Sequence, residues 1–149
     1  MSKKKKIIIV ISVILAIILT WNIVWAVHYF NLKSYAENIP SDGDGGYVTN
    51  DIEENSYSVK LPDYLQFNGN LALVDKDFNA LIIWVSLFDV KSYGVQICIG
   101  DFNTYDMLLD ENGQLLKEGN LDDAQEMYDA NKDIVDKLYE DANNFWVLK

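Results

Sequence analysis

An apolar run at residues 7–27 constrains this chain more than any other feature. It has no charged residue, and its polar members are limited to Ser12, Thr20 and Asn22. As a helix rising 1.5 Å per residue, it would be about 30 Å long, which matches the hydrocarbon thickness of a bilayer. We therefore expect residues 7–27 to form a transmembrane helix in contact with the lipid bilayer.

Charged and aromatic residues at the ends of this run predict its orientation. Four lysines lie within residues 1–6, whereas Lys33 is the only lysine close behind the run. Because lysine-rich flanks stay in the cytoplasm, we expect a signal anchor with the N-terminus inside and the C-terminal part outside the cell membrane. Trp21, Trp25 and Tyr29 recur every four residues near the outer end, where aromatic rings favour the headgroup level.

A cleaved signal peptide is the alternative reading of the same run. Val24 and Ala26 fit the small-residue pattern before a cleavage site, so cleavage near Ala26 would release a secreted protein. However, the run is longer than the core of about 7 to 15 residues that signal peptides use, and Trp25 adjoins the site. A single-pass anchor is therefore the preferred interpretation.

Small residues form a stripe along the predicted transmembrane helix. Ser12, Ala16 and Thr20 are spaced four residues apart, which places them on one helix face. Such a face lets two transmembrane helices approach closely, so it indicates a homo-oligomer contact. Scattered small residues without a role are the simpler alternative.

The part of the chain after the apolar run is strongly acidic, which restricts its partners. All 23 acidic residues follow Asn31 together with eight of the twelve lysines, so this part carries a net charge of −15. The chain has no arginine, the side chain best suited to bind phosphate. Since a negative field repels nucleic acid, we exclude nucleic-acid binding.

The sole cysteine, Cys98, leaves the outer part without an intrachain disulfide. The chain also lacks any Asn-x-Ser/Thr sequence for glycosylation, although it is rich in asparagine. Exported bacterial domains commonly fold without disulfides, so we expect a bacterial protein of the cell envelope.

Residues 28–56 are predicted to be a juxtamembrane segment and an acidic, glycine-rich linker. Pro40 disfavours helix at the preceding residue, and the stretch 41–46 alternates aspartate and glycine. Residues 57–149 then form one small extracytoplasmic domain.

Hydrophobic periodicity predicts that this domain is α+β, with about five antiparallel strands in meander order and one long C-terminal amphipathic helix. Period-two alternation or short apolar runs mark strands at residues 57–61, 71–74, 81–88 and 93–99, and a hairpin joins 105–109 to 114–117. Asn120 is expected to cap the helix. Apolar residues three, four or seven positions apart lie on one face of this helix and would pack on the sheet: Ala124, Tyr128, Val135, Leu138, Ala142 and Phe145.

Candidate metal ligands lie in the predicted linker. Asp42, Asp44 and Glu53 occupy places 1, 3 and 12 of an EF-hand-like loop, and their oxygens would suit calcium. Tyr47, however, stands at place 6, where the turn needs glycine. A solvated linker turn explains the same acidic residues.

Ile82, Trp84 and Phe88 project to one side of an apolar strand and form the candidate partner-binding patch. The simpler alternative is that the C-terminal helix or residues 47–55 cover these side chains as part of the core. The sole histidine, His28, lies at the end of the apolar run, so the domain lacks an imidazole base for nucleophilic catalysis. We therefore expect a non-catalytic, membrane-tethered interaction or accessory module without a cofactor. A calcium-responsive domain is the alternative, and a hydrolase with two carboxylates is the third hypothesis.

Overall fold

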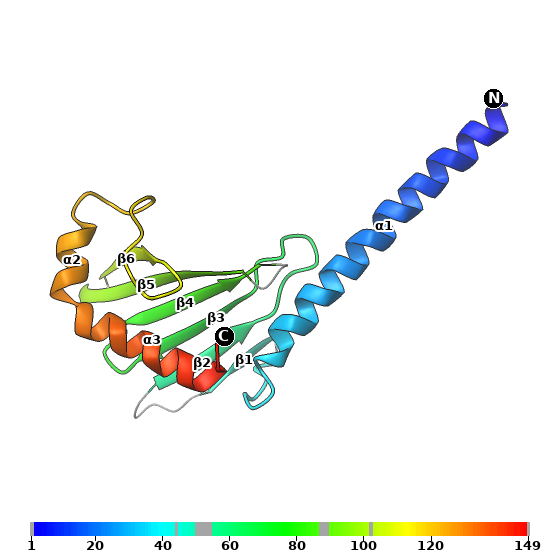
Figure 1. Cartoon of the computed structure of the whole chain (residues 1–149). Coiled ribbons are helices and arrows are strands. Elements are labelled where there is room, and N and C mark those ends of the chain that lie inside the picture. The colour runs from blue at the N-terminus through cyan, green and yellow to red at the C-terminus, as the bar shows by residue number, and fades with distance from the viewer. Residues whose placement is uncertain (1, 44, 50–54, 87–89, 102, 149) are drawn as a thin grey trace.

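The computed structural model describes residues 2–43, 45–49, 55–86, 90–101 and 103–148. It has a long N-terminal helix, a six-stranded antiparallel sheet and two C-terminal helices, which confirms the predicted α+β class (Figure 1). The elements in chain order are α1 (Lys3–Ser34), β1 (Gly46–Val48), β2 (Asn55–Lys60), β3 (Asn70–Asp75), β4 (Ala80–Val85), β5 (Lys91–Gly100), β6 (Asn103–Leu109), α2 (Ala124–Ala130) and α3 (Lys132–Trp146).

Helix α1 projects from the domain, and only its C-terminal end lies near the sheet (Figure 1). Among the described residues, α1 is the one helix long and apolar enough to cross a membrane, a property that anchors share with signal sequences. Beyond its apolar run, Leu32 is fully buried, and Ala36 and Ile39 in the following turns join the same hydrophobic core. The end of α1 is therefore part of the domain.

The sheet is a meander in which each strand pairs antiparallel with the next. Its two faces differ because side chains alternate along each strand. One face is buried and carries the row Val59, Leu71, Ile83, Tyr93 and Leu109. The adjoining row on the opposite face is smaller or only half-buried and consists of Ser58, Ala72, Ile82, Gly94 and Leu108.

The C-terminal helices cover the buried face. Helix α3 contributes a stripe of buried side chains spaced three or four residues apart, namely Val135, Leu138, Ala142 and Trp146. Each fully buried aliphatic side chain contributes about 1.5 to 3 kcal/mol, so this layer supplies much of the core's stability. Phe145, predicted on the stripe, is instead half-exposed and stacks on Tyr57 with 3.7 Å between ring centroids.

The prediction of one long helix capped by Asn120 is wrong in two respects. The C-terminal helical region begins with α2 at Ala124, after Asp123, and not at Asn120. It is also divided, because Asn131, with φ of −120°, separates α2 from α3. The Asn120 side chain instead accepts from the backbone N–H of Leu108 at 2.7 Å and donates to its carbonyl at 3.1 Å. Because this amide is engaged at the sheet edge, it does not cap a helix.

Two further differences concern strands. The predicted strand at residues 114–117 reduces to an isolated bridge between Leu109 and Leu115. In contrast, β1 forms within the predicted linker and pairs Tyr47 with Val59. A three-residue strand has no periodicity of its own, and its formation depends on an edge that β2 provides.

Candidate interaction surface

Trp84 lies on the sheet face opposite α3. Its neighbours Ile83 and Val85 are buried in the core, whereas Trp84 itself is 39% exposed. It contacts Gly94 on β5 so closely that a Cβ at Gly94 would lie 2.7 Å from Trp84 Cη2. The missing side chain at residue 94 thus leaves the space that the six-membered ring of the indole occupies.

Ile82 and Trp84 share this face, as predicted, and Ile82 is half-buried. Phe88, the third residue of the predicted patch, lies outside the described residues. Ala72, Val74 and Leu108 extend the surface on neighbouring strands, and all three are half-buried. We call Ala72, Val74, Ile82, Trp84 and Leu108 the open face.

The calcium prediction rests on residues that the structure describes only in part. Asp42 Oδ1 accepts a 2.9 Å hydrogen bond from the Gly46 backbone N–H and so closes a turn before β1. Asp44 and Glu53 lie outside the described residues. Across the described ranges, no group of three histidine, cysteine or acidic residues converges in a way that would hold a metal.

Cys98 and His28, the sole cysteine and the sole histidine, lie on different elements of the fold. Cys98 is half-buried on β5, and its backbone N–H donates to Asn79 Oδ1 at 3.0 Å. His28, a residue of α1, is buried against the β2–β3 loop, with its ring 5.9 Å from that of Phe67. The sequence placed His28 at the membrane boundary but contained no signal for this contact.

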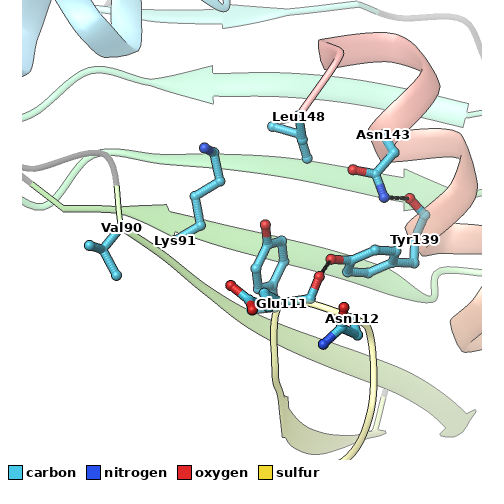
Figure 2. A pocket seen from close by; sticks show the side chains of 8 residues that line it. Val90, Lys91, Glu111, Asn112, Tyr139, Asn143 and Leu148 are labelled. Carbon is cyan, nitrogen blue, oxygen red and sulfur yellow. Dashed lines mark hydrogen bonds between the residues drawn. The ribbon is translucent and has the colours of Figure 1, made fainter.

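A cleft of about 640 Å³ that the sequence did not reveal lies between the start of β5, the 110–113 turn and α3 (Figure 2). Tyr139 donates its hydroxyl to the Glu111 carbonyl, and Asn143 donates to the Tyr139 carbonyl at 2.9 Å. Burial raises the pKa of Tyr93 and of Tyr139, so both phenols are protonated at neutral pH. Besides these phenols, the Glu111 carboxylate and the Lys91 ammonium line the cleft, so it offers hydrogen-bonding groups together with one charge of each sign.

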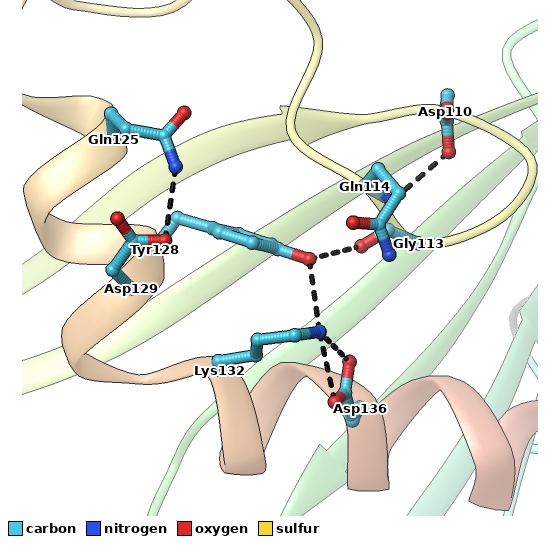
Figure 3. A network of polar contacts seen from close by, with 8 residues as sticks. All are labelled: Asp110, Gly113, Gln114, Gln125, Tyr128, Asp129, Lys132 and Asp136. Carbon is cyan, nitrogen blue, oxygen red and sulfur yellow. Dashed lines mark hydrogen bonds and ion pairs between the residues drawn. The ribbon is translucent and has the colours of Figure 1, made fainter.

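A polar network beside this cleft fixes the 110–114 turn to the helices (Figure 3). The Tyr128 hydroxyl donates to the Gly113 carbonyl at 2.9 Å, and Lys132 forms an ion pair with Asp136 at 2.8 Å. The backbone N–H of Gln114 donates to Asp110 within the turn. These contacts hold the turn in one conformation against the helices, and we assign the network a structural role.

The β2–β3 loop, residues 61–69, lies against the C-terminal part of α1 (Figure 1). Trp21 Nε1 donates to the Tyr64 carbonyl at 3.2 Å, and the rings of Trp21 and Phe67 are 4.9 Å apart. Nearer the domain, Trp25 meets Tyr64 edge-on at 5.4 Å. The tryptophans predicted to mark the membrane interface therefore also bind the folded domain.

The stripe of Ser12, Ala16 and Thr20 lies on the exposed part of α1. Ala16 and Thr20 line an apolar groove of about 470 Å³ to which Trp21, Val24 and Phe67 also contribute. The contact between two copies predicted from this stripe remains a prediction.

In comparisons with known proteins, no family model matches this chain, and neither does any curated protein or solved structure. The functional conclusion therefore depends on the geometry and chemistry of the chain itself.

Proposed function

We propose that this chain is a non-catalytic, membrane-tethered interaction module whose domain lies outside the cytoplasmic membrane of a bacterium. Helix α1 crosses the bilayer, and the lysines of residues 1–6 hold its N-terminus in the cytoplasm. The open face of the sheet, with Trp84 at its centre, binds a protein of the cell envelope.

The contacts of Trp21 and Trp25 favour a retained anchor over a cleaved signal. Cleavage near Ala26 would remove both indoles, so Tyr64 would lose Trp21 and Trp25, and Phe67 would lose Trp21 and keep His28. An aromatic pair is worth about 0.5 to 1.5 kcal/mol beyond its buried area, so the folded domain gains from keeping the segment.

The observation that carries the interaction role is the exposed indole on a face whose other apolar side chains are half-buried. Trp84 presents a broad apolar surface to solvent, and tryptophan is among the residues that dominate binding energy at protein interfaces. The surrounding domain is acidic, so the complementary partner has an apolar patch with lysine or arginine around it.

The test is crosslinking on intact cells that express the full chain, with Trp84→Ala against Phe145→Ala. Phe145 has the same exposed fraction, 39%, but lies on α3 in the other layer, so it controls for the loss of an aromatic ring. We expect Trp84→Ala to lose the crosslinked partner with little change in thermal transition, and Phe145→Ala to keep it. The partner should carry a basic surface, and high salt should slow its association. Equal capture by both variants, or collapse of the fold in Trp84→Ala, would refute the proposal.

A further inference from the structure

The β2–β3 loop reaches far along α1. Trp21, which contacts both Tyr64 and Phe67, lies six residues before Val27, the outer end of the apolar run. At 1.5 Å per residue, this distance is about 9 Å. The tip of the loop therefore lies at the depth of the apolar run and not beyond its end.

The apolar run of α1 is too short for the hydrocarbon layer to end before the contact of Trp21 with the loop. If the hydrocarbon ended before Trp21, residues 7–20 would have to span it alone, and they reach only about 21 Å. A typical hydrocarbon core is about 30 Å thick. A membrane crossed by α1 must therefore extend past Trp21 and surround the loop tip as well.

We propose that residues 64–67 of the β2–β3 loop insert into the outer leaflet beside α1 and contact lipid acyl chains. This inference rests on the proposed function, because it requires α1 to cross a bilayer. Leu65 is 75% exposed, and the Tyr64 side chain beside it is also exposed. Transfer of such side chains from water to lipid is favourable, at about 25 cal/mol per Å² of apolar surface.

The loop's hydrogen bonds suit an environment without water, where an unpaired backbone group costs several kcal/mol. The backbone N–H groups of Gln66 and Phe67 donate to the Asp63 carbonyl at 3.3 and 3.2 Å. The Asp63 N–H donates to Asn68 Oδ1, and the Asn68 amide donates to Gln66 Oε1 at 3.0 Å. Trp21 of α1 binds the Tyr64 carbonyl, so each of these polar groups has its partner within the loop or on α1.

The apolar groove along α1 continues the same surface. Phe67 of the loop and Trp21 line the part of the groove nearest the domain together with Val24, and Val13 and Ala16 line the part toward the N-terminus. An acyl chain is the occupant that fits, because lipid already surrounds this length of α1 and the lining is almost wholly apolar. Together, α1 and the loop would hold the domain at two points and so fix the angle of the sheet to the membrane.

Depth-dependent fluorescence quenching tests this proposal on the full chain. Cys98→Ser removes the native thiol, and Leu65→Cys then carries an environment-sensitive fluorophore in vesicles of phosphatidylcholine and phosphatidylglycerol. We expect nitroxide lipids labelled on the acyl chain to remove most of the emission, and external iodide to remove little. Leu65 is exposed in the structure, so its substitution leaves the core intact.

Two control positions separate the possible failures. Leu15→Cys reports on α1 itself, and Leu121→Cys reports on a 68% exposed side chain of the domain. Emission at residue 65 that iodide removes, as at residue 121, while residue 15 stays in lipid, would overturn loop insertion and leave the tether intact. Iodide access at residue 15 would overturn the tether and the inference together. Shielding of residue 65 from both quenchers would indicate a second copy of the chain and would also overturn the lipid assignment.

Discussion

Leu32→Ala tests whether the end of α1 is part of the domain core. Leu32 is fully buried, and it packs so closely on Gly69 that a Cβ atom at residue 69 would lie only 2.2 Å from Leu32 Cδ1. A buried leucine replaced by alanine typically costs about 2 to 5 kcal/mol. For a domain of this size each kcal/mol lowers the melting temperature by roughly 4 to 8 °C, so a loss of about 3 kcal/mol predicts a decrease of roughly 12 to 24 °C.

The assay is thermal unfolding of the full chain in detergent micelles, followed by near-UV circular dichroism, which reports on aromatic packing. Leu19→Ala is the matched control, because Leu19 lies on α1 and is 62% exposed. We expect the control to melt as the unchanged protein does. If Leu32→Ala also melted at that temperature, α1 would be a tether without a role in the core, and the reasoning would be refuted.

Three further predictions concern single contacts. Gly69→Ala should destabilise the domain by about 1 to 3 kcal/mol, because its Cβ would clash with Leu32. In chemical denaturation, the double variant Gly69→Ala, Leu32→Ala should lose less stability than the sum of the two single losses, because the clashing side chain is gone. Tyr128→Phe removes the donor to the buried Gly113 carbonyl, so urea unfolding should show a loss of about 0.5 to 1.5 kcal/mol, and an unchanged midpoint would contradict this. Burial raises the pKa of Tyr93, so its contribution to stability is complete below about pH 10 and is lost as the pH rises through the folded-state pKa. Absorbance titration should therefore show a late phenolate step that Tyr93→Phe removes, and a normal Tyr93 titration in the folded protein would refute the burial argument.

Elements with strong local patterns were predictable from the sequence. The apolar run of α1 and the strand β4 have compositions that favour one structure over long stretches. The helix formed over the whole predicted run, and β4 formed over residues 80–85 of a strand predicted at 81–88, whose residues 87 and 88 lie outside the described part of the chain. The one-sided placement of Trp84 also follows from strict alternation in β4. By contrast, β1 has three residues and exists because β2 offers an edge, which no local pattern indicates.

Long-range contacts were beyond local reasoning. Trp21 and Tyr64 are 43 residues apart, and Asn120 meets Leu108 across the sheet edge. Asparagine is a favourable N-cap residue, but the Asn120 side chain is hydrogen-bonded to the Leu108 backbone and so does not cap a helix. The tip of the β2–β3 loop likewise looks like an ordinary turn in the sequence, and only its position beside α1 makes it a candidate membrane contact.

The most direct test of the account is labelling of a single outer thiol on intact bacterial cells that express the full chain. Cys98→Ser combined with Leu121→Cys places one exposed thiol on the domain, and a membrane-impermeant maleimide reports whether that thiol faces the outside. We expect labelling before lysis, on a chain that retains α1 and stays with the membrane fraction. Labelling only after lysis, or on a chain shortened near Ala26, would contradict it.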